Sequence, residues 1–255
     1  MQPAAPIAEM QIVRAQSDNL KMRLGLVGPA GSGKTFTALE LCTMIGPTLI
    51  VDTEGGTSRY YARDGLEFDM IQLDQNYTLA QLQEVMNLAQ NYDCVIIDSF
   101  SSWWNGHNSI HETVAHYVEI QEIEAKRNGG NANPNTMPIW GKVKREQWQP
   151  AMKLINSAPN HVVLTMRSSN NVQQVKNERG RTRLETVGIK PEQDERILYE
   201  LDTVFYMQFT PQDEVVARCE KARCKDIRSL ELTNPKYADF SPYLQWLKVL
   251  PPTSN

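Results

Sequence analysis

The hydrophobic positions of this chain alternate between short continuous runs and longer periodic stretches. The continuous runs predict strands buried on both faces, as in a parallel sheet that helices cover. The predicted strands are 22–27, 48–53, 69–73, 94–98, 161–166 and 203–209. The periodic stretches predict helices at 34–45, 78–90, 109–127 and 141–157. In the second of these helices the apolar residues share one stripe, and Thr78 is the expected N-cap.

Polar segments interrupt this alternation. Residues 128–138, NGGNANPNTMP, predict a loop, and residues 170–183 predict a hairpin that turns near Gly180. A second hairpin is expected at 212–225. Pro150 lies inside the helix predicted at 141–157, so we expect that helix to kink or to begin late.

The pattern divides the chain into three parts. Residues 1–18 have no sustained period and predict a loosely held lead-in. Residues 19–226 predict a three-layer α/β/α core with a mostly parallel sheet and added β-hairpins. Residues 227–255 predict a C-terminal extension packed on this core, with a strand at 229–232 and a short helix at 243–247.

A phosphate-binding motif lies between the first predicted strand and the first predicted helix. Residues 28–35, GPAGSGKT, match the pattern G-x-x-x-x-G-K-[ST], which predicts a bound nucleoside triphosphate with Mg²⁺. Lys34 is expected to reach the outer phosphates, and the Thr35 hydroxyl is expected to ligate Mg²⁺. The residues expected to contact the nucleotide are Gly28, Pro29, Ala30, Gly31, Ser32, Gly33, Lys34, Thr35 and Phe36.

Acidic residues end two of the other predicted strands. Asp98 follows the run Val95-Ile96-Ile97 and is the second expected Mg²⁺ ligand, because ligands of open α/β sheets lie at the carboxyl ends of strands. In Asp52-Thr53-Glu54-Gly55-Gly56, Glu54 is the expected general base for the attacking water, provided that its strand neighbours the phosphate-loop strand. Asp52 is the rival base, and surface turn formation is the alternative for both acids.

Other polar and aromatic residues add candidates. Thr165 and Arg167 end another buried strand, where a polar side chain can sense the γ-phosphate or simply cap the strand. Lys221 and Arg223 alternate on one face of an extended segment, so they are either exposed charges or cations that reach the γ-phosphate of a neighbouring subunit. The pair Trp103-Trp104 favours a core or subunit interface over a stacking surface.

Charge is unevenly distributed along the chain. The whole chain has 26 Lys and Arg against 30 Asp and Glu, a net charge of −4. Residues 142–190 hold ten basic and three acidic residues, a charge of +7, so the remainder carries −11. A basic stretch on an acidic body suits an anionic polymer bound at one face, and the alternative is ordinary solvated charge on a helix and a hairpin.

Cysteine use and hydropathy indicate the compartment. The four cysteines do not complete a zinc site with each other or with a nearby histidine. The sequence contains no run of 18 apolar residues, and its first ten residues lack the pattern of a signal peptide. We therefore expect a cytoplasmic protein that does not engage a membrane.

Taken in order, several segments resemble the RecA-type core of phage single-strand-annealing ATPases, which are related to KaiC and the RecA recombinases. The resemblance covers residues 20–226 and is carried by GPAGSGKT, VDTEGGT, VIIDSF, WGKVKREQWQPAMKLI, HVVLTMRSS and VGIKPEQDERILYELDTVFYM. It implies a RecA-type fold, ATP and Mg²⁺ as cofactors, and single-stranded DNA as partner. It also implies a homo-oligomeric ring or filament, with a single-strand-binding or replication protein as a further candidate partner.

The resemblance implies roles residue by residue. Glu54 matches the catalytic glutamate, Asp98 the Walker B aspartate, and Lys34 with Thr35 the Walker A pair. Lys221 and Arg223 match trans-acting cations. Segments 128–138 and 168–190 match the two DNA-facing loops. The second of these carries the basic residues Lys176, Arg179, Arg181, Arg183 and Lys190.

One departure from the RecA pattern affects the expected activity. RecA recombinases have a glutamine at the strand end where this chain has Thr165. The sequence therefore favours DNA-stimulated ATP hydrolysis coupled to annealing over full strand exchange. The alternative is an ATPase that loads or remodels a replication protein. A small-molecule kinase is disfavoured, because no lid segment with several arginines follows the motif.

Overall fold

The computed structural model describes residues 14, 20–129, 134–176 and 182–249, with the backbone alone at 172–176 and 182–187. Within these residues, nine strands form one mixed sheet. The strands are β1 (Arg23–Gly28), β2 (Thr48–Asp52), β3 (Asp69–Gln72), β4 (Cys94–Asp98), β5 (His161–Lys176), β6 (Thr182–Pro191), β7 (Thr203–Phe209), β8 (Val215–Ala222) and β9 (Glu231–Thr233).

The sheet is mostly parallel. Its order is β3-β2-β4-β5-β1-β7-β8-β9, and β6 pairs with β5. The six strands from β3 to β7 in this order are parallel to their neighbours, whereas β6, β8 and β9 pair in the antiparallel sense. The carboxyl ends of the parallel strands therefore share one edge.

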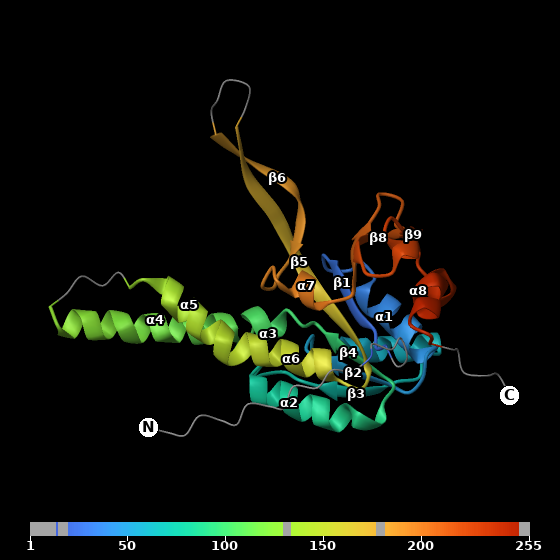
Figure 1. Ribbon diagram of the computed structural model, residues 1–255, viewed down its shortest axis with the longest axis horizontal. Helices are drawn as coiled ribbons and strands as arrows, with labels where there is room; N and C mark the ends of the chain where they lie inside the picture. The colour runs from blue at the N-terminus through green and yellow to red at the C-terminus, as the bar shows by residue number, and fades with distance from the viewer. Residues whose placement is uncertain (1–13, 15–19, 130–133, 177–181, 250–255) are drawn as a thin grey trace.

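Helices cover both faces of this sheet (Figure 1). The helices are α1 (Lys34–Thr43), α2 (Leu79–Leu88), α3 (Ser102–Asn105), α4 (Ile110–Arg127), α5 (Thr136–Val143), α6 (Gln149–Ser157), α7 (Ile197–Glu200) and α8 (Ser241–Trp246). Shorter helical segments are the 3₁₀ turns η1 (Thr57–Asp64), η2 (Ala89–Asn91), η4 (Lys225–Ile227) and η5 (Tyr237–Phe240), and the π turn η3 (Lys144–Trp148). Helices α2, α4, α5 and α6 pack on one face, and α1 and α8 pack on the other.

Two apolar cores explain why the central strands are continuous hydrophobic runs. Val95 and Ile97 of β4 belong to the core under α2 and α6. Cys94 and Ile96, one residue out of phase, belong to the core under α1 and α8. Successive side chains of a strand point to opposite faces, so a strand covered on both sides is apolar throughout. The predicted three-layer α/β fold with a mostly parallel sheet and added hairpins is confirmed.

Most element bounds agree with the sequence pattern. The strand at 94–98 and the strand at 203–209 match β4 and β7. Thr78 caps α2, because its side chain accepts a hydrogen bond from the Gln81 N–H at 3.2 Å. The elements after residue 227, β9 and α8, pack against the α1 side of the sheet through Tyr243 and Leu244.

Three expectations were wrong in detail. The loop predicted at 128–138 ends earlier, because α5 begins at Thr136 with Asn135 as its N-cap. The helix predicted at 141–157 is continuous with α5, and it widens into the π turn immediately before Pro150, which has no N–H to donate. The second hairpin consists of β7 and β8 instead of lying within 212–225, because β8 continues to pair with β7 as far as Ala222.

The hairpin of β5 and β6 projects from the layered body of the molecule. Strand β5 was expected to end at Met166, but it continues to Lys176 and leaves the central sheet to pair with β6. The hairpin projects away from the layers in Figure 1, while α4 and α5 form a separate helical arm. Both projections lie on the side of the molecule that the carboxyl ends of the parallel strands face.

Candidate functional site

The phosphate-binding motif forms a tight loop between β1 and α1. A side chain at Gly28 is excluded, because a Cβ there would lie 2.3 Å from the Met207 carbonyl oxygen. Gly33 has φ of 81° and is the N-cap of α1, a left-handed conformation that favours glycine. The backbone N–H groups of the loop and the N-terminus of a ten-residue helix thus face one space, as anion binding requires.

Lys34 folds back over this loop. Its Nζ donates hydrogen bonds to the carbonyl oxygens of Gly28 at 2.9 Å and Pro29 at 2.7 Å. Burial lowers the pKa of Lys34, and the nearby carboxylates of Asp98 and Glu54 act in the opposite direction. The ammonium group is therefore held at the mouth of the loop, between the backbone and the acidic residues.

Asp98 lies at the end of β4 and is held by two threonines. Its Oδ2 accepts a hydrogen bond from Thr35 Oγ1 at 2.8 Å, and its Oδ1 accepts one from Thr165 Oγ1. Burial raises the pKa of Asp98 to about 6, although both threonine hydrogen bonds favour the ionised form. The carboxylate and the Thr35 hydroxyl provide the oxygen ligands that Mg²⁺ prefers when phosphates and water complete its shell.

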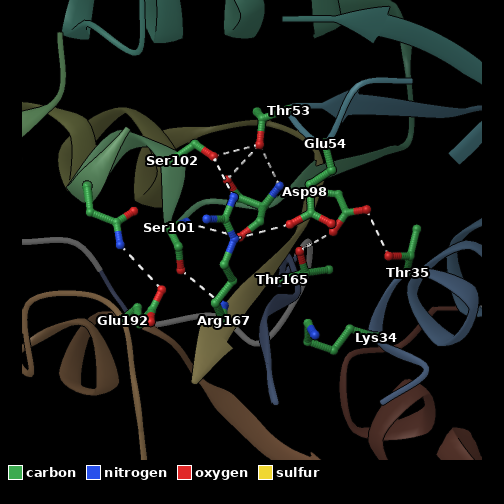
Figure 2. Close-up of polar contacts among 12 residues, drawn as sticks. Lys34, Thr35, Thr53, Glu54, Asp98, Ser101, Ser102, Thr165, Arg167 and Glu192 are labelled. Atoms are coloured by element: carbon green, nitrogen blue, oxygen red, sulfur yellow. Dashed lines mark hydrogen bonds and ion pairs between the residues drawn. The ribbon is translucent and has the colours of Figure 1, made fainter. Parts of the chain in front are cut away.

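Glu54 reaches the same space from a more distant strand. The condition set for Glu54, that its strand neighbours the phosphate-loop strand, is not met, because β4 and β5 lie between β2 and β1 in the sheet. The turn after β2 nevertheless brings the Glu54 side chain beside Asp98 (Figure 2). The Asp98 carboxylate is directed toward Thr35 and Thr165, whereas the Glu54 carboxylate is directed toward Arg167. The side chain of Glu54 is 40% exposed, so water can reach it.

Asp52, the rival base, is committed to the turn. It is fully buried, and its carboxylate accepts hydrogen bonds from the backbone N–H groups of Glu54 at 2.7 Å, Gly56 at 3.0 Å and Ser58 at 2.9 Å. This geometry fixes the acidic turn and leaves Glu54 as the accessible carboxylate.

Arg167 is the nearest cation to Glu54. Its Nε lies 3.2 Å from Glu54 Oε1, and a guanidinium nitrogen lies 3.4 Å from Ser102 Oγ (Figure 2). The Arg167 backbone N–H donates to Ser101 Oγ at 3.0 Å, and its carbonyl accepts from the Glu192 N–H at 2.8 Å. Arg167 is paired with Gly28 in the β1–β5 register, so it stands directly beside the phosphate-binding loop.

The two polar residues at the end of this strand segment therefore face different partners. Thr165 is fully buried and donates to Asp98, whereas the Arg167 side chain is 44% exposed and pairs with Glu54. The sequence pattern indicated both as polar residues at a strand end and did not predict the contact of Arg167 with Glu54. Strand alternation places both side chains on the same face, so it could not distinguish them. They differ in burial, which the sequence pattern does not show.

Lys221 and Arg223 lie away from the phosphate-binding loop of their own chain. Lys221 pairs with Val204, which pairs with Gly25, whereas the opposite end of β8, Val215, lies against Gly33. The Lys221 ammonium donates to the Leu201 carbonyl at 2.5 Å and to the Leu198 carbonyl. Arg223 is exposed and has no side-chain hydrogen bond or ion pair among the described residues.

Three of the five predicted DNA-facing residues lie on the projecting hairpin. Lys176 and Arg183 belong to β5 and β6 near its far end, where Lys176 pairs with Thr182. Arg179 and Arg181 lie outside the described residues. Lys190 is at the base of the hairpin, and its Nζ is 3.5 Å from Glu195 Oε1.

An aromatic pair beside the loop was not fully anticipated. The ring of Phe36 lies 5.9 Å from that of Tyr61 on η1, and Lys236 Nζ lies 4.9 Å from the Phe36 centroid. Burial, followed by the charges of Asp98, Asp64 and Glu54, raises the pKa of Tyr61. Tyr61 is therefore part of the same electrostatic environment, and two adjacent tyrosines after the acidic turn were the available sequence signal.

Trp103 and Trp104 have different surroundings. Trp103 is 4% exposed and donates from its indole nitrogen to the Thr78 carbonyl, so it belongs to the core, as predicted. Trp104 is half-buried and packs only partly against that core.

Comparison with known proteins identifies the domain. The family model AAA_24, described as an AAA domain, matches residues 20–236. No curated protein matches the chain. In the part of the chain that the structure describes, no helix is long and apolar enough to cross a membrane.

Proposed function

The chain belongs to this AAA domain family of P-loop ATPases, and on that premise we propose that it hydrolyses ATP while bound to single-stranded DNA and promotes annealing in homologous recombination. One observation carries the proposal. Strand β5 passes Arg167 beside the candidate base Glu54 and continues without a break into the hairpin that carries Lys176. A single element thus joins the nucleotide site to the basic hairpin.

Hydrolysis would use the residues gathered at the edge of the sheet. Lys34 and the loop N–H groups would hold the phosphates, and Thr35 with Asp98 would hold Mg²⁺, whose positive charge neutralises charge that develops on the phosphates. Glu54 would orient and deprotonate the attacking water. Among the described residues, no group of three or more His, Cys, Asp and Glu side chains forms a metal site, which suits an ion held largely by phosphate and water.

Arg167 would regulate the base in this scheme. Its ion pair with Glu54 is nearly half-exposed on both sides, and pairs of that kind contribute only ~0–1 kcal/mol. A triphosphate beside Gly28 would therefore compete well for the guanidinium. Transfer of Arg167 from Glu54 to the phosphates would free the carboxylate for water and shift the strand that begins the hairpin.

The strand of DNA would be held chiefly by charge. The basic stretch counted from the sequence, +7 between residues 142 and 190, includes the end of α5, helix α6 and the hairpin. Lysine and arginine contacts to phosphates give sequence-independent binding that weakens steeply with salt. Thr165, buried against Asp98, supports annealing over ATP-gated strand exchange, because it cannot extend toward the hairpin.

A ring or filament would complete the site in this proposal. Arg223 is exposed at the end of β8 remote from its own phosphate-binding loop, which suits a cation that acts on a neighbour. Lys221 is the weaker candidate for this role, because its ammonium is already bonded to two carbonyl groups of its own chain.

The alternative function, an ATPase that loads or remodels a replication protein, has one observation in its favour. The helical arm of α4 and α5 presents exposed apolar side chains at Ile120, Ile123 and Met137, which are 36%, 43% and 76% exposed. A protein partner would cover such a surface more readily than DNA would.

Titration of DNA affinity with salt separates these two functions. We expect the double variant Lys176→Gln and Arg183→Gln to bind a single-stranded oligonucleotide more weakly and with a salt slope reduced by about 0.7 for each lost phosphate contact. The matched control is Lys126→Gln with Arg127→Gln, two cations in the last turn of α4. Equal slopes for the wild type and the hairpin variant would exclude the hairpin as the DNA site and favour the alternative.

A further inference from the structure

Three aromatic rings from three different helices meet at the base of the hairpin. The ring of Trp104 on α3 lies 5.0 Å from His111 on α4 and 5.8 Å from Trp140 on α5. The rings of His111 and Trp140 are 4.8 Å apart and nearly perpendicular. Such spacings are those of rings in direct contact.

These rings are not simply core. Trp103 and Trp148, their neighbours in sequence or space, are 4% and 3% exposed, whereas Trp104 and Trp140 are half-buried and His111 is exposed. Trp104, His111 and Lys144 line an open cleft of about 570 Å³, and the Trp140 ring borders it through its contacts with Trp104 and His111. A cleft of this size accommodates a small planar ring system.

The floor of the cleft is a paired charge cluster. Lys144 Nζ lies 2.6 Å from Asp194 Oδ2 and about equally far, 5.6 and 5.5 Å, from the ring centroids of Trp104 and Trp140. Arg196 Nε lies 3.0 Å from Asp194 Oδ1. Burial opposes ionisation of Asp194, but hydrogen bonds from Arg196 and Lys144 outweigh it and lower its pKa to about 2.

This cluster leaves the cleft without unpaired negative charge on its floor. The Asp194 side chain is only 3% exposed and is shared by two cations. At the rim, Glu195 pairs with Lys190, and Glu192 accepts a hydrogen bond from Asn105 at 3.3 Å. Burial and the charge of Lys144 lower the pKa of His111, which keeps its ring neutral near pH 7.

The cleft adjoins the base of the hairpin and is linked to the candidate nucleotide site. Ser169 and Lys190, which line it, are paired in the β5–β6 register at the base of the hairpin. Glu192, also in its lining, donates its backbone N–H to the Arg167 carbonyl, and Arg167 pairs with Glu54. A strand that runs down the hairpin to Ser169 and Lys190 would therefore reach the cleft.

We propose that the Trp104, His111 and Trp140 rings form a stacking site for an unpaired base of single-stranded DNA. Neutral aromatic faces under a partly exposed lysine attract the π-face of any base, and the side-chain amide of Asn105 at the rim can contact its edge. This inference rests on the proposed function, because it assigns the site at which the bound strand is held by its bases. The hairpin cations would hold the phosphates on either side.

The test compares two oligonucleotides of equal length. One is a thymidine oligomer, and the other has the same sugar-phosphate backbone with abasic positions. We expect the wild type to bind the thymidine oligomer about tenfold more tightly, as stacking of a base on an aromatic side chain predicts. Trp140→Ala and His111→Ala should remove this preference and leave affinity for the abasic oligomer unchanged, and Trp140→Phe should retain most of it.

Trp246→Ala is the matched control. Trp246 is likewise a half-buried tryptophan packed against a core, but it lies on α8 on the opposite face of the sheet. It should keep the full preference for bases. His111 is exposed, so His111→Ala provides a folded variant even where removal of Trp140 unfolds the chain.

The possible outcomes test the stacking site and the proposed DNA-binding function separately. If the two cleft variants keep the preference, or lose affinity for both oligonucleotides equally, the stacking site is overturned while DNA binding by the hairpin stands. If the wild type binds neither oligonucleotide, the proposed function and this inference both fail. Loss of the base preference in the cleft variants alone supports both.

Discussion

The guanidinium of Arg167 lies 3.2 Å from the carboxylate of Glu54, although the two side chains come from strands that β4 separates in the sheet. The pair exists because β5 ends its central segment beside Gly28 while the acidic turn after β2 bends back over β4. The candidate base and the strand that becomes the hairpin are therefore linked by one partly exposed ion pair.

Removal of the Arg167 guanidinium should uncouple hydrolysis from DNA. In Arg167→Ala, Glu54 has no cation to release, so the ATPase rates with and without single-stranded DNA should become equal within about twofold. Steady-state ATPase assays at saturating ATP measure this ratio. Arg218→Ala is the control, because Arg218 is an exposed strand residue whose ion pair with Glu220 is long, at 3.9 Å. A stimulation factor in Arg167→Ala equal to that of the wild type would contradict the coupling role.

The Thr35 hydroxyl should be required for the Mg²⁺ dependence of the reaction. Thr35→Ala removes an oxygen ligand and one of the two hydroxyl groups that hold Asp98, so the rate at saturating ATP should fall at least about tenfold. Thr35→Ser retains the hydroxyl and should keep most of the activity. Titration of the rate with Mg²⁺ provides the measurement, and identical curves for Thr35→Ala and the wild type would exclude Thr35 as a ligand.

Sequence patterns predicted the parts of this site that depend on local geometry. The loop Gly28–Thr35, the strand that ends at Asp98 and the turn that carries Glu54 are each set by neighbouring residues: glycines that adopt tight conformations, an apolar run, and a buried aspartate. The layer arrangement was also predictable, because a run such as 94–98 can be satisfied only by cover on both faces.

What the sequence did not predict depends on strand order and on long-range contacts. Nothing near Glu54 indicates that β4 and β5 separate its strand from β1, or that Arg167, 113 residues away, pairs with it. The aromatic cleft likewise joins α3, α4 and η3 with residues 190–196, which no periodicity relates. The continuation of β5 past Met166 was missed because its sequence becomes polar where it leaves the core.

His161 should make the fold less stable in mild acid. It is 6% exposed, and its Nδ1 accepts the Met22 N–H at 3.1 Å, which requires an unprotonated nitrogen. Burial, together with the charges of Lys21 and Arg23, lowers its pKa from 6.5 to about 4. The unfolded chain therefore binds a proton that the folded chain excludes between these values, so stability is lost as pH falls below 6.5.

The expected loss from this one group is about 2 kcal/mol between about pH 7.5 and about pH 5. Urea denaturation of the wild type and of His161→Asn at both pH values measures it, because asparagine retains an acceptor and does not titrate. The wild type should lose about 2 kcal/mol more than the variant. Equal losses in the two proteins would show that His161 is not the responsible group.

Arg223 should act on the nucleotide of a neighbouring subunit. Arg223→Ala alone should reduce ATPase activity by about 10³ if it stabilises the transition state in trans. In an equal mixture of the Arg223→Ala and Glu54→Gln proteins, the subunits would assemble at random. At about a quarter of the interfaces, the intact Glu54 of one subunit would then face the intact Arg223 of its neighbour. Activity should recover to about that fraction of the wild-type rate. A mixture no more active than the sum of its components would exclude a shared site.

The most direct test of the account is the steady-state ATPase rate of the wild type and of Glu54→Gln, each with and without single-stranded DNA. The account predicts that DNA raises the wild-type rate and that Glu54→Gln lowers the stimulated rate by about 10²-fold or more while ATP binding persists. A wild-type rate that does not respond to DNA, with Glu54→Gln still inactive, would preserve the hydrolytic site and contradict the claim that it serves single-stranded DNA.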